Sequence, residues 1–155
     1  MRAQIAAPRP RPLDLASTAP VVLYDGDCGV CQRVADRLST RHGEDVAVWR
    51  PWQAETALPA GLTRARLERE IVMIGPGGEL VGGHRVFAHV LRRTPGWRAL
   101  GLLIALPGPG LVARLVYRLF AARRRWLSLR LGLSACRLPR RIEAPINLTI
   151  EEGED

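Results

Sequence analysis

Short apolar runs alternate with segments of helical periodicity along the first half of the chain. Three apolar runs rich in β-formers predict buried strands at residues 21–24, 46–49 and 71–74. Between the first two, Val30, Val34 and Leu38 recur every four residues, which predicts an amphipathic helix that ends at His42 and Gly43. A strand, a helix and a strand within about 30 residues predict a parallel, right-handed βαβ unit.

The following segments extend this unit. Thr63 is suited to be the N-cap of a short helix that precedes the third run. That run continues through a glycine-rich turn into a hairpin partner at residues 79–81. Gly82 and Gly83 end this strand, and a further helix follows. The resulting order, β-α-β-α-β-β-α, predicts an α/β fold with a thioredoxin-like core over residues 21–94.

The rest of the chain is more helical and more apolar. Residues 95–139 are expected to form a helical extension of the same domain, in two segments separated by the Pro-Gly-Pro-Gly sequence 107–110. The apolar stretch 99–106 is far shorter than the roughly 20 residues that cross a bilayer, and the second segment carries arginines. We therefore expect both segments to pack on the sheet, with an interfacial membrane contact as the alternative. The composition of the two ends of the chain predicts a disordered, proline-rich leader at residues 1–20 and a flexible acidic tail at residues 140–155.

The charge of the chain is unusual, because the formal net charge is +8 and all 23 basic residues are arginine. The simplest interpretation is a solvated arginine surface, followed by attraction to anionic substrates or to a membrane surface. Since no zinc-finger, basic-zipper or aromatic RNA-binding motif accompanies the arginines, nucleic acid is not an expected partner. A length of 155 residues with 47% hydrophobic residues fits one globular domain.

Cysteine usage favours a reducing compartment. Three cysteines cannot all pair within one chain, and a secreted disulfide framework would need more of them. The first 20 residues lack the continuous apolar run of a signal peptide. We therefore expect a cytoplasmic location.

Cys28 and Cys31 form a Cys-x-x-Cys motif directly after the first strand, at the start of the first helix. The free amides and dipole of a helix N-terminus favour a thiolate, so Cys28 is the expected nucleophile. Cys31, one turn deeper, is expected to be less exposed and to resolve the mixed disulfide. The adjacent carboxylate of Asp27 opposes part of this effect unless it caps the helix. The motif thus predicts thiol–disulfide exchange without a metal or organic cofactor.

A second function stays open, because half of a zinc site has the same spacing. The remaining candidate ligands form no second paired motif; they are Cys136, His42, His84 and His89. The alternative is therefore a zinc- or partner-binding module that uses the cysteines structurally.

Around the cysteine pair lies an Asp-x-x-Cys-x-x-Cys signature made by Asp25, Cys28 and Cys31. In this signature the chain resembles the DCC family of thiol–disulfide oxidoreductases. The Pro-Trp-Gln sequence at 51–53 resembles the family's Pro-x-Gln, and the stretch 83–91 resembles its Gly-x-x-Ala helix start. The resemblance covers most of residues 21–139. It implies a thioredoxin-like fold and redox activity on thiol or disulfide substrates, such as glutathione or a protein disulfide.

Two positions depart from thioredoxins and glutaredoxins. Asp27 stands where those proteins carry a tryptophan before the first cysteine. Arg69 and Glu70 lead into the third strand, where those proteins carry a cis-proline that shapes the substrate groove.

Three further residues each keep two interpretations. Asp25 is either a buried acid–base partner of Cys31 or the start of an Asx-type turn. Cys136 is either a bystander thiol or a third redox partner. His84 is either a surface residue at a helix start or a proton shuttle.

The corner at Gly82, Gly83, His84 and Arg85 is the candidate substrate-binding site. Glycine lets a backbone approach a ligand closely, and a helix N-terminus favours an anion. Glutaredoxins are similar here, since a Gly-Gly turn approaches glutathione and the following helix start holds a carboxylate. We therefore expect the corner to face the cysteine pair and to hold the anionic end of a thiol such as glutathione.

Overall fold

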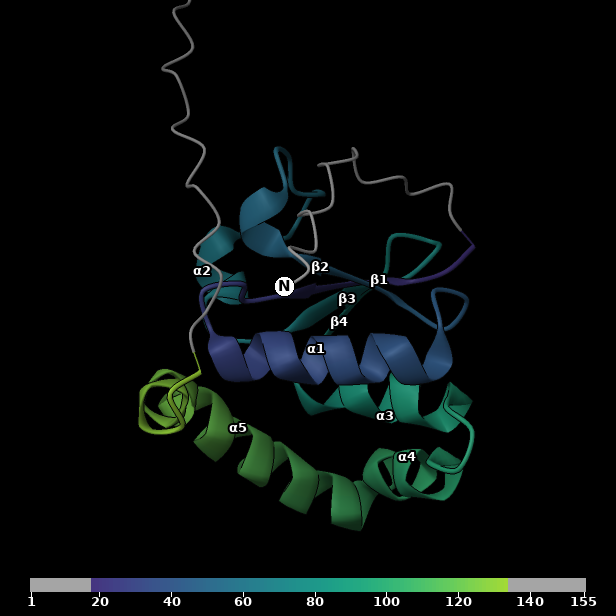
Figure 1. Ribbon diagram of the computed structural model, residues 1–155. Coiled ribbons are helices and arrows are strands. Elements are labelled where there is room, and N and C mark those ends of the chain that lie inside the picture. The colour runs from purple at the N-terminus through teal and green to yellow at the C-terminus, as the bar shows by residue number, and fades with distance from the viewer. Residues whose placement is uncertain (1–17, 134–155) are drawn as a thin grey trace, which may run out of the picture.

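The computed structural model describes residues 18–133, which form a mixed α/β domain with a four-stranded sheet and five α-helices (Figure 1). The strands are β1 (Val21–Tyr24), β2 (Val48–Pro51), β3 (Val72–Ile74) and β4 (Leu80–Gly82). The helices are α1 (Gly29–His42), α2 (Arg64–Leu67), α3 (His84–Arg93), α4 (Arg98–Ala105) and α5 (Pro107–Arg130), with a 3₁₀ helix η1 (Trp52–Ala54) after β2. This arrangement is consistent with a thioredoxin-like fold.

The sheet has the strand order β2-β1-β3-β4. β1 pairs in parallel with β2, while β3 is antiparallel to both β1 and β4. Leu23 near the end of β1 lies opposite Val72 at the start of β3, and Val72 lies opposite Gly82 at the end of β4. The end of β4 therefore lies at the same end of the sheet as the turn from β1 into α1. The predicted parallel pair and hairpin are confirmed.

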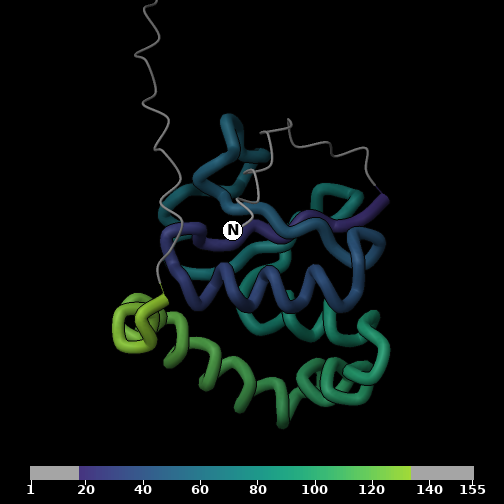
Figure 2. The backbone as a smooth tube through the Cα atoms, viewed as in Figure 1, coloured from purple at the N-terminus to yellow at the C-terminus, as the bar shows by residue number. Residues whose placement is uncertain are grey.

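Two apolar clusters hold the sheet between layers of helix. On one face, Val22 and Met73 pack with Val86 and Val90 of α3, and α1 covers the same face (Figure 2). On the other face, Leu23 and Val72 pack with buried residues of the segment that contains α2, including Leu67. β1 is buried along its whole length because it is a central strand covered on both faces. The sheet thereby holds the turn that follows β1 in a fixed place.

Several predicted boundaries differ from the structure: β3 begins at Val72 rather than at residue 71, and β4 spans Leu80–Gly82 rather than 79–81. Two further boundaries differ by more. β2 begins at Val48 rather than at residue 46, because residues 44–46 form a turn. The Val48 N–H donates to the carbonyl of Pro20, the residue before β1 (2.9 Å). The segment 107–110 does not separate two helices but forms the first turn of α5. Proline is tolerated in that turn because its first amides have no intrahelical partner. The break between the helices lies at Leu106, which has an extended backbone.

The helical extension forms a further layer rather than packing directly on the sheet. α5 contacts α1, α3 and α4, and it lies beyond α1 and α3 as seen from the sheet (Figure 1). Tyr117 of α5 nevertheless reaches the edge of the core. No described helix alone has the length and hydropathy to cross a bilayer, whereas α4 and α5 meet that test only as a pair bent by 95°. Residues 1–17 of the predicted leader and the whole of the predicted acidic tail lie outside the described residues, as does Cys136.

Candidate functional site

The cysteine pair is formed by the N-cap and the third residue of α1. Cys28 has an extended backbone, and its Sγ accepts a hydrogen bond from the N–H of Cys31 at 3.4 Å. The Cys31 thiol donates to Cys28 Sγ with 2.7 Å between the sulfur atoms. Both cysteines are present as free thiols. The local sequence thus places two thiols in contact, with Cys28 at the amides of the helix N-terminus.

The end of α5 covers Cys28. Ser128 Oγ lies 3.6 Å from Cys28 Sγ, accepts a hydrogen bond from Val30 N–H at 3.2 Å and donates to the Arg124 carbonyl at 2.9 Å. A Cβ on Gly29 would overlap the carbonyl of Leu133, so the turn after α5 lies directly on the start of α1. Cys28 is consequently 0% exposed, whereas Cys31 is half-buried. The expectation that Cys31 is the less exposed thiol is therefore wrong, because residues about 100 positions away cover Cys28.

The two thiols differ strongly in their readiness to ionise. The hydrogen bond from the Cys31 thiol lowers the pKa of Cys28 to about 6 against the opposing effect of burial. The Cys31 N–H, the Ser128 hydroxyl and the charge of Arg124 contribute further to this lowering. The hydrogen bond to Cys28 and burial raise the pKa of Cys31. The first proton lost by the pair therefore leaves the charge on Cys28, the arrangement that favours Cys28 as attacking thiolate.

We expect the alkylation rate of Cys28, expressed as a fraction of its maximum, to rise with pH through a midpoint near 6. It should level off above about pH 7.5, because the thiolate is the reacting species. Ser128→Ala removes the hydroxyl next to Cys28 Sγ and should move the midpoint upward. Ser39→Ala is the matched control, because the Ser39 hydroxyl bonds only within α1. Mass spectrometry of the labelled peptides separates the cysteines; a wild-type midpoint at the free value of about 8.5 contradicts the geometry.

Gly29→Ala tests whether the turn after α5 limits access to Cys28. The new methyl group overlaps the Leu133 carbonyl, so the turn must move outward. We expect alkylation of Cys28 at a pH where it is fully ionised to become about threefold faster or more. Gly108→Ala is the control, since a Cβ there meets open space. An unchanged or slower rate at Cys28 would show that the turn does not limit access.

A buried ion pair lies beside the thiols. Asp25 Oδ2 is 3.1 Å from Arg124 Nη2, and both side chains are almost fully buried. Asp25 Oδ1 accepts hydrogen bonds from Gln53 Nε2 at 2.8 Å and from Asp27 N–H at 3.0 Å. Gln53 Oε1 in turn accepts from Gly26 N–H at 2.9 Å. The bond to Asp27 is an Asx-type turn, and the carboxylate also has the buried position that an acid–base role requires.

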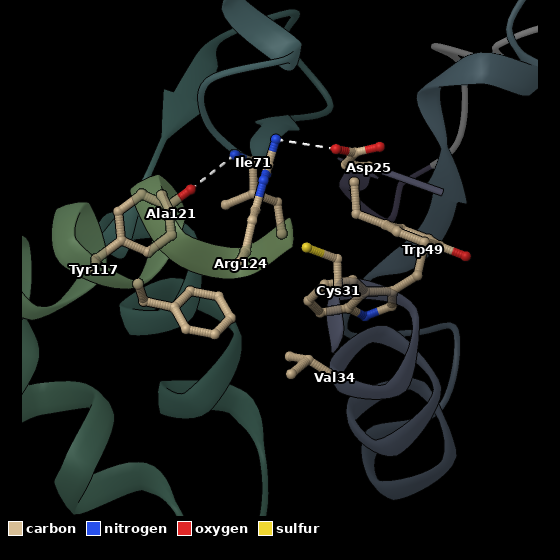
Figure 3. A pocket seen from close by; sticks show the side chains of 10 residues that line it. Asp25, Cys31, Val34, Trp49, Ile71, Tyr117, Ala121 and Arg124 are labelled. Atoms are coloured by element: carbon tan, nitrogen blue, oxygen red, sulfur yellow. Dashed lines mark hydrogen bonds and ion pairs between the residues drawn. The ribbon is translucent and has the colours of Figure 1, made fainter. Parts of the chain in front are cut away.

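A small cavity of about 30 Å³ adjoins this ion pair (Figure 3). Its lining includes Asp25, Cys31 and Arg124 together with the apolar side chains of Trp49 and Ile71. Figure 3 shows the Cys31 sulfur directed into the space between these residues. The cavity is large enough for one water, and Asp25 Oδ2 accepts no hydrogen bond from any described residue. Ile71 occupies the position directly before β3.

The predicted substrate-binding corner does not line the cavity beside the thiols. It is formed by Gly82, Gly83, His84 and Arg85. It lines a groove of about 1420 Å³ between β4, α3 and the bend of α4 and α5, and this groove does not include either cysteine. Tyr117 lines both the groove and the cavity and lies against Gly83. Its hydroxyl accepts a hydrogen bond from Ile71 N–H at 2.9 Å. The structure thus brings the corner to the expected end of the sheet but places the Tyr117 ring between it and the thiols.

The groove is electropositive. Arg66, Arg69, Arg85, Arg114 and Arg118 line it, accompanied by the carboxylates of Glu68 and Glu70. Burial, followed by the charges of Arg85 and Arg114, lowers the pKa of His84.

No cluster of three or more His, Cys, Asp or Glu side chains suited to a metal occurs within residues 18–133.

Sequence reasoning missed four residues of the site: Gln53, Tyr117, Arg124 and Ser128. Gln53 belongs to the Pro-x-Gln resemblance, which was a usable signal. The three others lie on one face of α5, at spacings of seven and four residues. That helical spacing was visible in the sequence, but nothing local showed which face of the helix is buried.

The fold and site define a mixed α/β protein with a close pair of thiols at a helix N-terminus. The family model for DCC1-like thiol-disulfide oxidoreductase matches residues 22–130, and the chain belongs to this family. No curated protein and no solved structure matches the chain.

Proposed function

We propose that this protein catalyses thiol–disulfide exchange through Cys28 and Cys31 on a thioredoxin-like fold. The observation that carries the proposal is the contact between the two sulfur atoms, in which the Cys31 thiol stabilises a Cys28 thiolate. Family membership supports the same reaction class.

The reaction has two exchange steps. The Cys28 thiolate attacks one sulfur of a substrate disulfide, so that the substrate S–S bond breaks and the first substrate thiolate leaves. Cys31 then loses its proton and attacks the Cys28 sulfur, which releases the second substrate thiolate. The products are a Cys28–Cys31 disulfide and a substrate dithiol, so two electrons have passed to the substrate. The reverse sequence oxidises a substrate dithiol.

Asp25 is our candidate for the proton acceptor of Cys31. The carboxylate and the thiol line the same cavity, whose volume of about 30 Å³ accommodates a bridging water. Gln53 and Arg124 hold the carboxylate in place through the contacts described above. A general base accelerates the second exchange step most at Cys31, because the raised pKa of this thiol opposes its deprotonation.

The Cys28 nucleophile must become accessible during the cycle. Ser128 and the turn that ends at Leu133 cover it, so a substrate disulfide reaches the sulfur only when this segment moves. The reaction thus includes an opening of the α5 end in addition to the two exchange steps.

A trapping experiment with Cys31→Ser tests the proposal. The first exchange step proceeds in this variant and the second cannot, so a mixed disulfide between Cys28 and the substrate should accumulate and be visible by mass. A thiol titration of the wild-type protein should show two thiols that disappear on oxidation and return with dithiothreitol. A zinc measurement on the same sample tests the structural alternative. Bound zinc at about one ion per chain with no trapped disulfide would overturn the redox assignment.

The substrate class is a thiol or disulfide compound, and we propose an anionic one such as glutathione at the Gly82–Arg85 corner. The arginines that line the groove support an anionic ligand. Its sulfur would pass Tyr117 to reach the cavity that Cys31 lines, so a movement of that ring accompanies binding in addition to the opening of the α5 end over Cys28.

Arg85→Ala is expected to lower the rate with glutathione about tenfold while leaving the rate with mercaptoethanol unchanged, since a charge-assisted contact is worth about 1.5–3 kcal/mol. Arg37→Ala on α1 is the matched control for charge. Equal rates with both thiols, or an equal loss with both, would refute the assignment of this corner.

A further inference from the structure

α5 carries polar side chains inward and apolar side chains outward. Its residues that face the rest of the domain include Tyr117, Arg124 and Ser128, whose contacts are described above. Its outward residues include six apolar side chains that are 54–83% exposed: Leu111, Val112, Leu115, Leu119, Trp126 and Leu129. An amphipathic helix on the surface of a globular protein has the reverse arrangement. The exposed stripe therefore indicates a binding surface.

The apolar surface continues across the bend into α4. Leu102, Leu103 and Leu106 are each about half exposed, at 48–53%. Both helices belong to the layer farthest from the sheet (Figure 2). We call these nine exposed apolar residues, which belong to α4, to α5 and to the break between them at Leu106, the outer face.

Positive charge accompanies the outer face. The sequence contains no Asp or Glu from residue 80 to residue 142. On α5, the exposed Arg114, Arg118 and Arg125 flank the apolar stripe at helical spacing. Arg130 lies 5.0 Å from the centroid of the Trp126 ring. Leucine, tryptophan and arginine together on one helix are typical of helices that lie in the interface of an anionic membrane.

A second copy of the chain would fit this surface poorly. Two outer faces brought together would place arginines of like charge side by side, with no carboxylate on α3, α4 or α5 to compensate them. An anionic bilayer instead offers phosphates to the arginines and hydrocarbon to the leucines. The bend of 95° excludes a straight span of the paired helices but permits both to lie along a surface.

We infer that the outer face binds the surface of a bilayer that contains anionic phospholipids, with α5 lying in the plane of the interface. The helix is about 36 Å long, so most of its outward side contacts lipid at once. Its inward side holds Arg124 and Ser128 at the thiols, so the dithiol lies within about one helix diameter of the bilayer. The inference goes beyond the proposed function and does not depend on it.

Vesicle binding of the full-length protein tests the inference. The probe is a vesicle with about 30% phosphatidylglycerol in phosphatidylcholine, compared with phosphatidylcholine alone. We expect sedimentation with the anionic vesicles, weakened by raising NaCl from about 0.05 M to about 0.5 M. The emission of Trp126 should shift to shorter wavelength on binding, and Trp126→Phe should remove that shift.

Two pairs of variants separate the contributions of the outer face. Leu115→Ser with Leu119→Ser should weaken partitioning at least about tenfold, because two exposed side chains no longer insert. Arg118→Ala with Arg125→Ala should weaken it more than Arg33→Ala with Arg37→Ala, which removes the same charge from exposed positions on α1. Cys28 alkylation by a small reagent should be unchanged in the leucine variant, which shows that it is folded.

Several results would overturn the inference. The first is that the protein does not bind anionic vesicles, and the second is that the leucine variant binds them as well as wild type. The third is that the two arginine pairs lose vesicle partitioning equally. The fourth is a dimer in sedimentation equilibrium that dissociates in the leucine variant. Loss of the proposed redox activity would not affect any of these measurements, so the two proposals fail separately.

Discussion

Cys28→Ser is expected to reduce disulfide reduction to the uncatalysed rate, a loss of at least about 100-fold. The hydroxyl of serine is not ionised at neutral pH, and it cannot form the mixed disulfide. The measurement is reduction of a chromogenic disulfide with excess dithiothreitol as the electron source. Because Cys28 is fully buried, circular dichroism should be recorded on the same sample to show that the variant is folded.

The matched control for this variant is Cys136→Ser, which removes the third thiol. Cys136 lies outside the described residues, and we predict activity within about twofold of wild type, because the two exchange steps through Cys28 and Cys31 need no third thiol. A loss of tenfold or more would make Cys136 a participating thiol. If Cys28→Ser retained the wild-type rate, the assignment of the nucleophile would fail.

Arg124→Met is expected to lower the free energy of unfolding by about 3–5 kcal/mol, because it leaves the buried carboxylate of Asp25 without its partner. Arg124 also donates to the Glu68 carbonyl at 2.5 Å, which adds to the loss. Urea unfolding would show this as a midpoint lowered by at least about 1 M, since slopes in urea reach at most about 3 kcal/mol/M. The same variant should raise the pKa of Cys28, since the positive charge of Arg124 helps to lower it.

The neighbouring residue supplies the control. Arg125 is exposed, so Arg125→Met should change stability by no more than about 0.5 kcal/mol. The double variant Asp25→Asn with Arg124→Met should lose less than the sum of the single losses, because the pair is removed together. Equal effects of Arg124→Met and Arg125→Met would show that the buried ion pair contributes nothing.

The sequence alone determined the features that depend on neighbouring residues. The apolar runs predicted β1 and β3, and the four-residue spacing of Val30 and Val34 predicted α1. The Cys-x-x-Cys spacing placed both sulfurs in the first turn of that helix, since the geometry of one helical turn is local. Thr63 was correctly expected to cap α2, where its Oγ1 accepts from Arg66 N–H. These predictions succeed because backbone geometry over a few residues follows from side-chain type and spacing.

Only the tertiary structure decided how the thiols are covered and which face of α5 is buried. Arg124 lies between Arg123 and Arg125, and the sequence suggests a solvated run of charge. In the fold, Arg124 turns inward to Asp25, ninety-nine residues earlier, while four of the five leucines of α5 face outward. Ser128, one turn further on, covers Cys28 and reverses the expected order of exposure of the two thiols. Helical periodicity shows that a helix has two faces, but the choice between them depends on which distant groups are available as partners.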